Sequence, residues 1–302
     1  MQSVLITGGS GLIGSELSEK LLRRGYQVFH LSRSISNSTS IIKFKWDYHS
    51  NFIDSEAIQK ADFIIHLAGE SLVQKRWTKK QKTSIIESRV KTTNLLFSEV
   101  KRQNKKLKAF ITASGVGYYG AINSEDIATE EDHYHNDFLG NVCLQWEKSA
   151  EPFNKLSIRT VALRTGMVLS SKGGALSKLL PTFKWGIGSA IGSGQQNVSW
   201  IHIDDLCEMY IKAIEDDKME GAYNAVAPEH ISNYKFSKTI ASILKKPFWM
   251  PNIPGVILKL ILGKMSIMLL KGIKVSSKKI EGAGFKFAFP TLESALQNLI
   301  EK

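Results

Sequence analysis

A glycine-rich loop near the start of the chain constrains its fold more than any other feature. The segment GGSGLIG at positions 8–14 fits the spacing G-x-x-G-x-x-G. It directly follows the apolar run VLI at positions 4–6, and it opens a stretch in which Ile13, Leu17 and Leu21 recur at every fourth position until Gly25. Strand, tight turn and amphipathic helix in this order are typical of a dinucleotide-binding unit.

The chemistry of this loop explains its glycines. Glycine tolerates unusual backbone angles, and without a Cβ it lets the main chain approach a pyrophosphate closely. The first N–H groups of the following helix then bind the phosphates. An ordinary tight turn would not need three glycines at this spacing, so we predict that Gly8, Gly11, Leu12, Ile13 and Gly14 contact an NAD(P) cofactor.

The end of the second predicted strand indicates which cofactor binds. NAD enzymes usually place a carboxylate there to hold the ribose 2′-hydroxyl, but this chain has Leu31-Ser32-Arg33-Ser34. Ser32 can donate a hydrogen bond to a 2′-phosphate, and Arg33 can pair with it through its guanidinium fork. We therefore predict NADP(H) over NAD(H), with a merely solvated Arg33 as the alternative.

Composition narrows the remaining classes. A chain of 302 residues, 43% hydrophobic and 23% charged, can bury a large core. A net charge of +12 favours anionic partners such as nucleotide phosphates. Basic residues are spread along the chain with only one short run, at 101–108, and no recognition motif accompanies them, so we predict no nucleic acid partner.

Cysteines and apolar runs bear on the cell compartment. Cys143 and Cys207 lie far apart without metal-ligand spacing, which predicts no metal site and a reducing compartment. The N-terminus enters a strand pattern directly, so we expect a cytoplasmic protein without an export signal. Pro254 and three lysines interrupt the apolar stretch 253–273, which lacks the ~20 apolar residues of a membrane span. We expect core helices there, forming an exposed groove, and no membrane contact.

Strand and helix patterns alternate through the first half of the chain, which predicts an α/β fold, a Rossmann-type doubly wound parallel sheet. The expected strands are 27–31, 41–46, 62–67, 107–112 and 157–163, and the expected helices are 55–60, 78–103 and 137–153. After Arg164 glycines are frequent, and short strands near 198–203 and 222–226 precede a mostly helical remainder. We predict an NADP-binding domain at 1–165, which also takes in about 195–226, and a smaller C-terminal substrate lobe with a helical region at 166–302.

Several motifs resemble the extended short-chain dehydrogenases/reductases, which carry the glycine loop and a fourth-strand His-Leu-Ala-Gly, here at positions 66–69. More narrowly, the chain resembles the atypical 39U group of that superfamily over almost its whole length. The matching segments are 68–71, 75–77, 88–90, 113–120, 146–147, 164–169 and 199–206, with a C-terminal region of unknown function at 251–272 and 284–296. The resemblance implies the extended Rossmann fold, and a homodimer through helices 78–103 and 137–153 as is common in the superfamily.

The resemblance also implies cofactor contacts beyond the loop. Six residues fall on nucleotide-contacting positions of the group, and Gly69 continues one of the motifs: Ser32, Arg33, Leu67, Ala68, Gly69, Arg89 and Val168. Two of these, Leu67 and Ala68, also end a strand beside the expected switch point, although they could simply pack the core. From its helical position, Arg89 either reaches a phosphate or extends to solvent.

Catalysis in this superfamily uses a Tyr-x-x-x-Lys pair together with a Ser or Thr. The only such pair here is Tyr234 with Lys238, in the expected substrate lobe and some 120 residues after Ser114, so we do not assign it to catalysis. Registering Glu147 with a similar superfamily residue puts Leu139 and Cys143 at the Tyr and Lys positions. Neither side chain can replace its counterpart, because leucine moves no proton and a neutral thiol carries no positive charge.

Candidates for catalysis therefore come from the loop after the fifth predicted strand. Ser114 and Tyr119 are the acid/base candidates, and the alternative is that the tyrosine ring only walls the pocket. We interpret His202 and Asp204 as structural, with the aspartate at the start of the next helix. The glycine-rich segment 186–195 is expected beside the substrate pocket, where it could close over a ligand.

Two functions compete at this point. The first is an NADP(H)-dependent oxidoreductase or epimerase-like enzyme that acts on a small polar molecule, nucleotide-linked compounds among the candidates, without the Tyr-x-x-x-Lys pair. The alternative is a non-catalytic NADP(H)-sensing binding protein, which the resemblance links by name to cell division. The glycine loop supports both functions equally, because each needs a bound cofactor.

Overall fold

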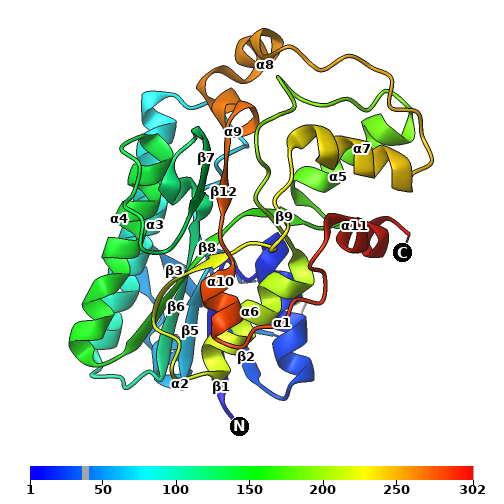
Figure 1. The fold of residues 1–302 in the computed structure, drawn as a ribbon. Helices are drawn as coiled ribbons and strands as arrows, with labels where there is room; N and C mark the ends of the chain where they lie inside the picture. Colours follow the sequence, from blue (N-terminus) through cyan, green and yellow to red (C-terminus); the bar gives the residue numbers. More distant parts are fainter. Residues whose placement is uncertain (36–40, 302) are drawn as a thin grey trace.

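A twisted eight-stranded sheet lies at the centre of the computed structural model, which describes residues 1–35 and 41–301 (Figure 1). The strand order is β11-β8-β6-β5-β1-β2-β3-β4, and every neighbouring pair is parallel except β3 and β4. The strands are β1 (Ser3–Thr7), β2 (Gln27–Ser32), β3 (Ile42–Asp47), β4 (Phe52–Ile53), β5 (Phe63–His66), β6 (Ala109–Gly115), β8 (Arg159–Thr165) and β11 (Gly221–Ala225). The order reverses at β1, as in a doubly wound fold, so the predicted fold class is confirmed.

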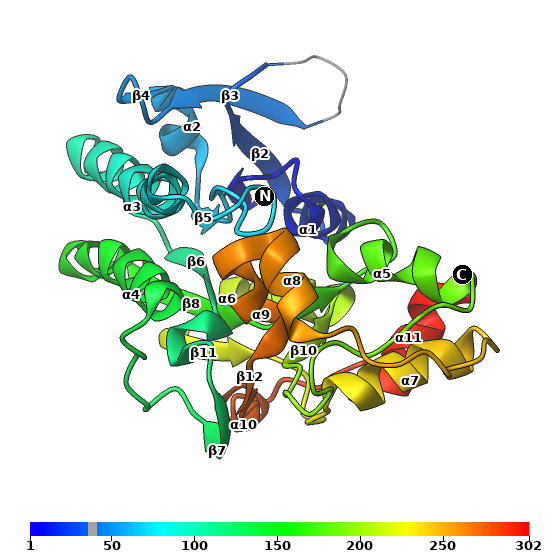
Figure 2. The same cartoon turned by 90° about the horizontal axis from the view of Figure 1, so that it is seen from above.

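Helices cover both faces of this sheet (Figures 1 and 2). On one face, α1 (Leu12–Arg23) and α6 (Ile203–Glu215) pack in the same apolar cluster as Val4 and Ile6 of β1. On the other, α2 (Ser55–Lys60), α3 (Lys79–Arg102) and α4 (Phe138–Ala150) pack in the cluster that contains Leu5. Side chains alternate along a strand, so the three consecutive apolar residues Val4, Leu5 and Ile6 allow β1 to be buried on both faces.

Local chemistry explains where the predicted elements end differently. Thr78 caps α3 by accepting a hydrogen bond from Gln81 N, so the helix begins one residue later than expected. After Ala150 the chain continues as a 3-10 helix, η2 (Glu151–Leu156), because Pro152 supplies no N–H for the α-helical ladder. The sequence did not predict the antiparallel β4, whose two residues are too few for a periodic pattern.

The C-terminal lobe is built around its own apolar cluster. In it, α5 (Gly174–Lys184), α7 (Asn233–Ile243) and α11 (Leu292–Ile300) surround the parallel pair β9 (Met167–Leu169) and β10 (Trp200–His202), with Trp200 fully buried. A second parallel pair, β7 (Asn123–Ala128) and β12 (Gly272–Val275), joins the lobe to the main body. The remaining elements are the 3-10 helices η1 (Val116–Tyr119) and η3 (Gly263–Ser266) and the helices α8 (Gly255–Leu262), α9 (Ile267–Leu270) and α10 (Lys278–Gly282).

The expectation of core helices in 253–273 is wrong for α8, which has no buried residue. This helix is apolar at almost every position, but it lies on the outside of the molecule, where Figure 1 shows it uppermost. Among residues 1–35 and 41–301, no helix is long and apolar enough to cross a membrane. The same residues contain no group of three or more His, Cys, Asp or Glu that could hold a metal ion.

Candidate functional site

The loop between β1 and α1, residues 8–14, is named the phosphate cradle here. Gly8 has φ +72°, and its carbonyl oxygen accepts a hydrogen bond from Gly11 N at 3.0 Å. A Cβ on Gly14 would lie 2.4 Å from Gly8 O, and a Cβ on Gly9 would lie 2.5 Å from the ring of His30. The loop therefore closes on itself and on β2 only with glycine at these positions.

The outer side of the phosphate cradle fits an anion. A Cβ on Gly11 would meet only Gly8 O, at 3.2 Å, so the backbone is otherwise open there. Helix α1 begins at Leu12 with no side-chain cap and no acidic residue in its first turn. The first N–H groups of a helix have no intrahelical acceptor and carry a partial positive charge, which suits the pyrophosphate of an NAD(P) cofactor.

The start of the loop after β5 packs against the phosphate cradle. Thr7 Oγ1 accepts hydrogen bonds from Leu67 N and Ala68 N, each at 3.2 Å, and a Cβ on Gly8 would lie 3.0 Å from Ala68 N. His66 Nδ1 lies 2.7 Å from the same threonine oxygen, and burial lowers the pKa of His66 to about 3. The neutral imidazole of His66 thus holds the Thr7 hydroxyl in place, and this hydroxyl positions the backbone of Leu67 and Ala68, which are predicted to contact the cofactor.

The sequence left two roles open for Arg89, and the solvent-exposed one is wrong. Arg89 is buried beneath Gly69, whose Cβ would lie 3.0 Å from the guanidinium carbon. Its Nη1 donates to Glu70 O at 3.0 Å and to Ile85 O at 2.9 Å, and the guanidinium lies 4.7 Å from the ring centroid of Trp146. Burial lowers the pKa of Arg89 to about 10, so the group stays charged at neutral pH.

Two further predicted contact regions reach the same edge of the sheet. Thr7 pairs with Leu31 across β1 and β2, so the half-buried Ser32 and the exposed Arg33 follow beside the phosphate cradle. Gly173 and Gly174 follow β9, and a Cβ added to either glycine would lie 3.3 Å from the Leu12 side chain. That Cβ on Gly174 would also be 3.5 Å from Val168 O, so the β9 segment borders the first turn of α1.

An ion pair between the buried Arg164 and the half-buried Glu147 holds Ser114 at the end of β6. Ser114 Oγ donates to Glu147 Oε1 at 2.6 Å, and Arg164 donates from Nε and Nη2 to the two oxygens of the same carboxylate, at 2.9 and 2.8 Å. Burial works against the charge of Arg164, but the hydrogen bonds and charge of Glu147 raise its pKa overall. Because the carboxylate accepts the hydroxyl proton, the Ser114 oxygen can only accept further hydrogen bonds, and the Cys143 side chain already lies within hydrogen-bond reach of it.

Tyr119 belongs to the same cluster, and its geometry favours the alternative in which the ring walls the pocket, while its acid/base role stays a prediction. Its hydroxyl donates to Asn224 Oδ1 at 2.7 Å and accepts from Arg164 Nη1 at 2.9 Å, and the side chain is buried. Burial raises the pKa of Tyr119 to about 12. A hydroxyl that is fully hydrogen-bonded and harder to ionise than usual suits a side chain that lines the site. We call Ser114, Tyr119, Glu147, Arg164 and Asn224 the Ser114 cluster.

The residues registered with the superfamily Tyr and Lys do lie against this loop. A Cβ on Gly117 would be 3.2 Å from Leu139 Cβ and 3.8 Å from Cys143 Sγ. Both side chains are buried, and burial raises the pKa of Cys143 to about 12, so the thiol is neutral at physiological pH. This part of α4 therefore offers neither a proton nor a positive charge.

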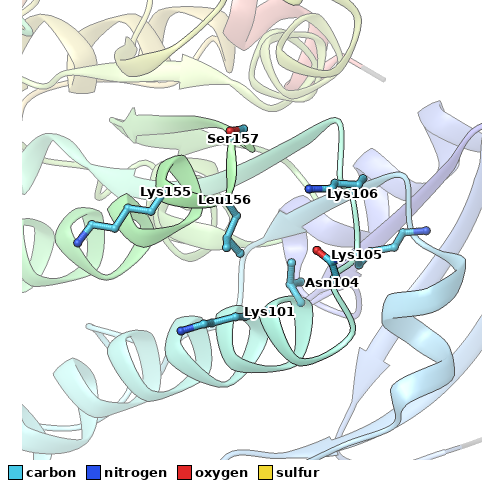
Figure 3. A pocket seen from close by; sticks show the side chains of 8 residues that line it. Lys101, Asn104, Lys105, Lys106, Lys155, Leu156 and Ser157 are labelled. Carbon is cyan, nitrogen blue, oxygen red and sulfur yellow. The ribbon is translucent and has the colours of Figure 1, made fainter.

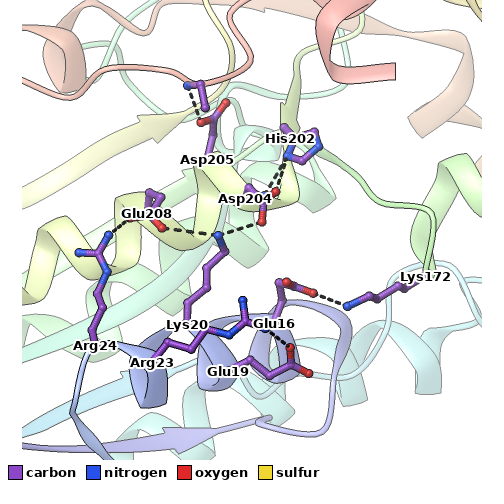
Figure 4. Close-up of polar contacts among 11 residues, drawn as sticks. Glu16, Glu19, Lys20, Arg23, Arg24, Lys172, His202, Asp204, Asp205 and Glu208 are labelled. Atoms are coloured by element: carbon purple, nitrogen blue, oxygen red, sulfur yellow. Dashed lines mark hydrogen bonds and ion pairs between the residues drawn. The ribbon is translucent and has the colours of Figure 1, made fainter. Parts of the chain in front are cut away.

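His202 has a structural position, but the expected cap is wrong in detail: His202 itself caps α6, and Asp204 and Asp205 lie in the first turn of that helix. Nδ1 accepts a hydrogen bond from Asp204 N at 3.0 Å, and the imidazole stacks on Phe289 with centroids 3.9 Å apart. Asp204 in turn pairs with Lys20 of α1 at 2.9 Å, one of several ion pairs that tie α1 to α6 (Figure 4).

The glycine-rich segment 186–195 lies against a later part of the C-terminal lobe. Its Ile191 forms a parallel bridge with Ile253, and Ser189 Oγ donates to Pro251 O at 2.5 Å. Tyr234, whose pairing with Lys238 we did not assign to catalysis, packs on Phe248 in the same lobe. The expectation that this segment closes over a ligand stays a prediction.

Sequence reasoning missed the polar partners that organise the Ser114 cluster. Glu147 and Arg164 were noticed only as parts of resembling motifs, and Asn224 not at all. One signal was available: Arg164 directly follows the apolar run VAL at 161–163, and an arginine that continues a buried strand requires a counter-charge. The sequence does not say which carboxylate supplies it.

Comparison with known proteins agrees with this geometry. The model of the NAD dependent epimerase/dehydratase family matches residues 4–225, from β1 to β11. The chain belongs to this family. Residues 253–299 match a domain of unknown function, DUF1731, which covers α8 to α11. The predicted resemblance is therefore confirmed for both parts of the chain.

Relatives extend over the full length of the chain. An epimerase family protein of Staphylococcus aureus, SA0724, is 35% identical over 306 residues, which cover 100% of both chains. The crystal structure of the human epimerase family protein SDR39U1 with NADPH has a TM-score of 0.89 at 32% identity, with 100% of both chains covered. A nucleoside-diphosphate sugar epimerase from Corynebacterium glutamicum has a TM-score of 0.81 at 30% identity, covering 99% of this chain and 58% of that one.

Proposed function

We propose that the chain is an NADP(H)-dependent oxidoreductase or epimerase that acts on a small polar, nucleotide-linked substrate without a Tyr-x-x-x-Lys pair. The observation that carries this proposal is the placement of Ser114. Its strand β6 is separated from the phosphate cradle of β1 only by β5, so both lie at the carboxyl edge of the sheet, where ligands of open α/β folds bind.

In this proposal, different residues of the chain bind the cofactor and position the substrate. The nicotinamide, when bound, gives or accepts a hydride. The phosphate cradle holds the pyrophosphate, while Ser32 and Arg33 favour a 2′-phosphate because no carboxylate follows β2 before Asp47. Ser114 accepts a hydrogen bond from a substrate hydroxyl, since Glu147 already takes its own proton. The human relative described with NADPH and the bacterial sugar-nucleotide epimerase support this cofactor and substrate class.

A screen of sugar nucleotides and carbonyl compounds tests the enzyme, with NADPH absorbance for net reduction and chromatography of the sugar nucleotides for epimerisation, which returns the hydride and consumes no cofactor. We expect the wild type to convert a sugar nucleotide, with or without net NADPH consumption, and Ser114→Ala to lose this conversion. The matched control is Ser98→Ala, an exposed helical serine of α3, which should keep full activity. Turnover that survives Ser114→Ala would remove this residue from the mechanism.

The second candidate, a non-catalytic NADP(H) sensor, is favoured by one observation. Leu139 and the neutral Cys143 occupy the part of α4 that faces the Ser114 loop. A sensor would bind NADPH and change its protection from hydrogen exchange with no compound consumed in the screen. Cofactor consumption by the wild type would exclude a purely sensing role.

A further inference from the structure

An apolar helix stands uncovered at one end of the molecule. On α8, the side chains of Val256 and Leu260 are 68% and 73% exposed, and Ile257 and Ile261 are also exposed. Figure 2 shows α8 and α9 over the centre of the molecule when it is seen from above. A run of adjacent exposed aliphatic residues on one helix is rare on a free protein surface and marks a contact surface.

The surroundings hold α8 firmly in this position. Arg76 Nη2 donates to Leu260 O and Ile261 O, at 3.1 and 2.6 Å, and so satisfies carbonyls at the end of the helix. Beneath it, Leu262 and Met265 pack in a cluster with Trp77 of the loop before α3. The exposed face is therefore part of the folded structure and not a frayed end.

Tryptophans extend this surface along the neighbouring segments. Trp249 is 69% exposed, and Trp185 is 81% exposed. The two segments touch, because a Cβ on Gly186 would lie 3.6 Å from Pro247 Cγ, and Ile253 bridges to Ile191. We call Trp185, Trp249, Val256, Ile257, Leu260 and Ile261 the apolar ridge.

Charge identifies the partner of the apolar ridge. The three segments that form it and hold it in place contain no Asp or Glu: residues 71–86 carry five Lys or Arg, residues 165–203 three Lys, and residues 230–280 ten Lys. Four of these lysines, Lys75, Lys172, Lys235 and Lys274, pair with carboxylates of other segments. Within residues 1–35 and 41–301 the others, Lys259 and Lys264 beside the exposed side chains of α8 among them, form no salt bridge. A twofold dimer would bring this surface against itself and set lysines against lysines. Nucleic acid would satisfy the charge but would gain little from exposed aliphatic side chains.

We propose that the apolar ridge docks on an anionic lipid bilayer, with α8 lying in the interface. Aliphatic side chains would enter the acyl boundary, tryptophans would sit at the level of the headgroups, and lysines such as Lys259 and Lys264 would pair with lipid phosphates. The sequence argument against membrane contact excluded only a membrane span, and it expected the helices of this stretch to pack in the core.

A second basic surface provides a matched control. Lys101, Lys105, Lys106 and Lys155 line a hollow of about 220 Å³ where α3 ends (Figure 3). None of the exposed large apolar side chains of the described residues is among the lining residues. If net charge alone drove lipid binding, this surface would matter as much as the apolar ridge.

Vesicle co-sedimentation of the full chain tests the proposal. The wild type should sediment with vesicles of equimolar phosphatidylcholine and phosphatidylglycerol and stay in solution with phosphatidylcholine alone. The double variant Val256→Ser, Leu260→Ser should bind at least about tenfold more weakly, because two aliphatic side chains that would enter the bilayer are lost. Lys259→Gln with Lys264→Gln should also weaken binding, while Leu22→Ser on α1 and Lys101→Gln with Lys106→Gln should not.

Tryptophan fluorescence gives an independent readout. Trp46, Trp77, Trp146 and Trp200 are buried, so a blue shift on vesicle addition reports on Trp185 and Trp249, and it should shrink in Trp249→Phe. Failure of the wild type to bind anionic vesicles, or equal binding by the Val256/Leu260 variant, would overturn the proposal. So would light scattering that shows a wild-type dimer turned monomeric by this variant, which would assign the apolar ridge to a second copy.

Discussion

The phosphate cradle and the Ser114 cluster lie at the same edge of one sheet, but different parts of the chain hold them together. The phosphate cradle is made of backbone: its shape depends on Gly8, Gly9 and Gly14, and its outer side is left open for a ligand. The Ser114 cluster is made of side chains that satisfy one another through an ion pair and buried hydrogen bonds. The difference teaches that cofactor binding and chemistry can change separately within this fold, because each rests on different residues.

Removing the Glu147 carboxylate should give the largest change in stability, and the change should come from the Ser114 cluster and not from the phosphate cradle. Glu147→Ala leaves Arg164 charged, buried and unpaired, which should lower the free energy of unfolding by about 3–5 kcal/mol. Urea denaturation measures this loss. Glu87→Ala, in the exposed pair with Lys91, should change stability by about 0.5 kcal/mol or less. A small effect of Glu147→Ala would mean that the ion pair does not organise the cluster.

Gly14→Ala should disrupt the phosphate cradle and weaken cofactor binding. Its Cβ would lie 2.4 Å from Gly8 O, so the loop must open and NADPH affinity should fall about a hundredfold, roughly 2.7 kcal/mol. Calorimetric titration measures the affinity. Gly282→Ala is the matched control, since a Cβ there meets nothing within 4 Å. Unchanged NADPH binding by Gly14→Ala would place the cofactor elsewhere.

Acid should lower the free energy of unfolding through two buried histidines beside the phosphate cradle. Burial lowers the pKa of His30, which packs against Gly9, to about 4, and that of His66 to about 3. Both are depressed below an unfolded value of about 6.5, so their stabilisation is complete above that pH and is lost as pH falls toward the folded values. The urea midpoint of unfolding should therefore drop between pH 6.5 and pH 5. The variant His133→Gln, which removes an exposed histidine, is the control and should show the same change of midpoint with pH. A flat profile over that range would contradict the neutral buried state of both histidines.

Arg33→Ala should produce the smallest change and sharpen the cofactor assignment. Loss of the guanidinium should weaken NADPH binding by about tenfold and leave NADH binding unchanged, because only NADPH carries the 2′-phosphate. Titration of both cofactors checks this prediction. Arg23→Ala, which removes another exposed positive charge, on α1, controls for net charge. An equal loss for both cofactors would show that Arg33 does not read the 2′-phosphate.

The predictability of each region follows from how local its determinants are. The phosphate cradle could be predicted because its glycines, strand and helix lie within about 20 consecutive residues. The Ser114 cluster could not, because Tyr119 and Asn224 meet across 105 residues and their pairing depends on the packing of β6, β8 and β11. Helix α8 was misplaced for a related reason: hydrophobicity predicts that a residue prefers to be covered, but not what covers it.

Calorimetric titration of NADPH into the wild type and into Ser114→Ala tests the central claim most directly. The claim is that the chain holds NADP(H) at the phosphate cradle independently of the Ser114 cluster. The expected result is saturable binding at one site with the same Kd in both proteins. No saturable binding by the wild type, or a Kd raised about tenfold or more in Ser114→Ala, would contradict it.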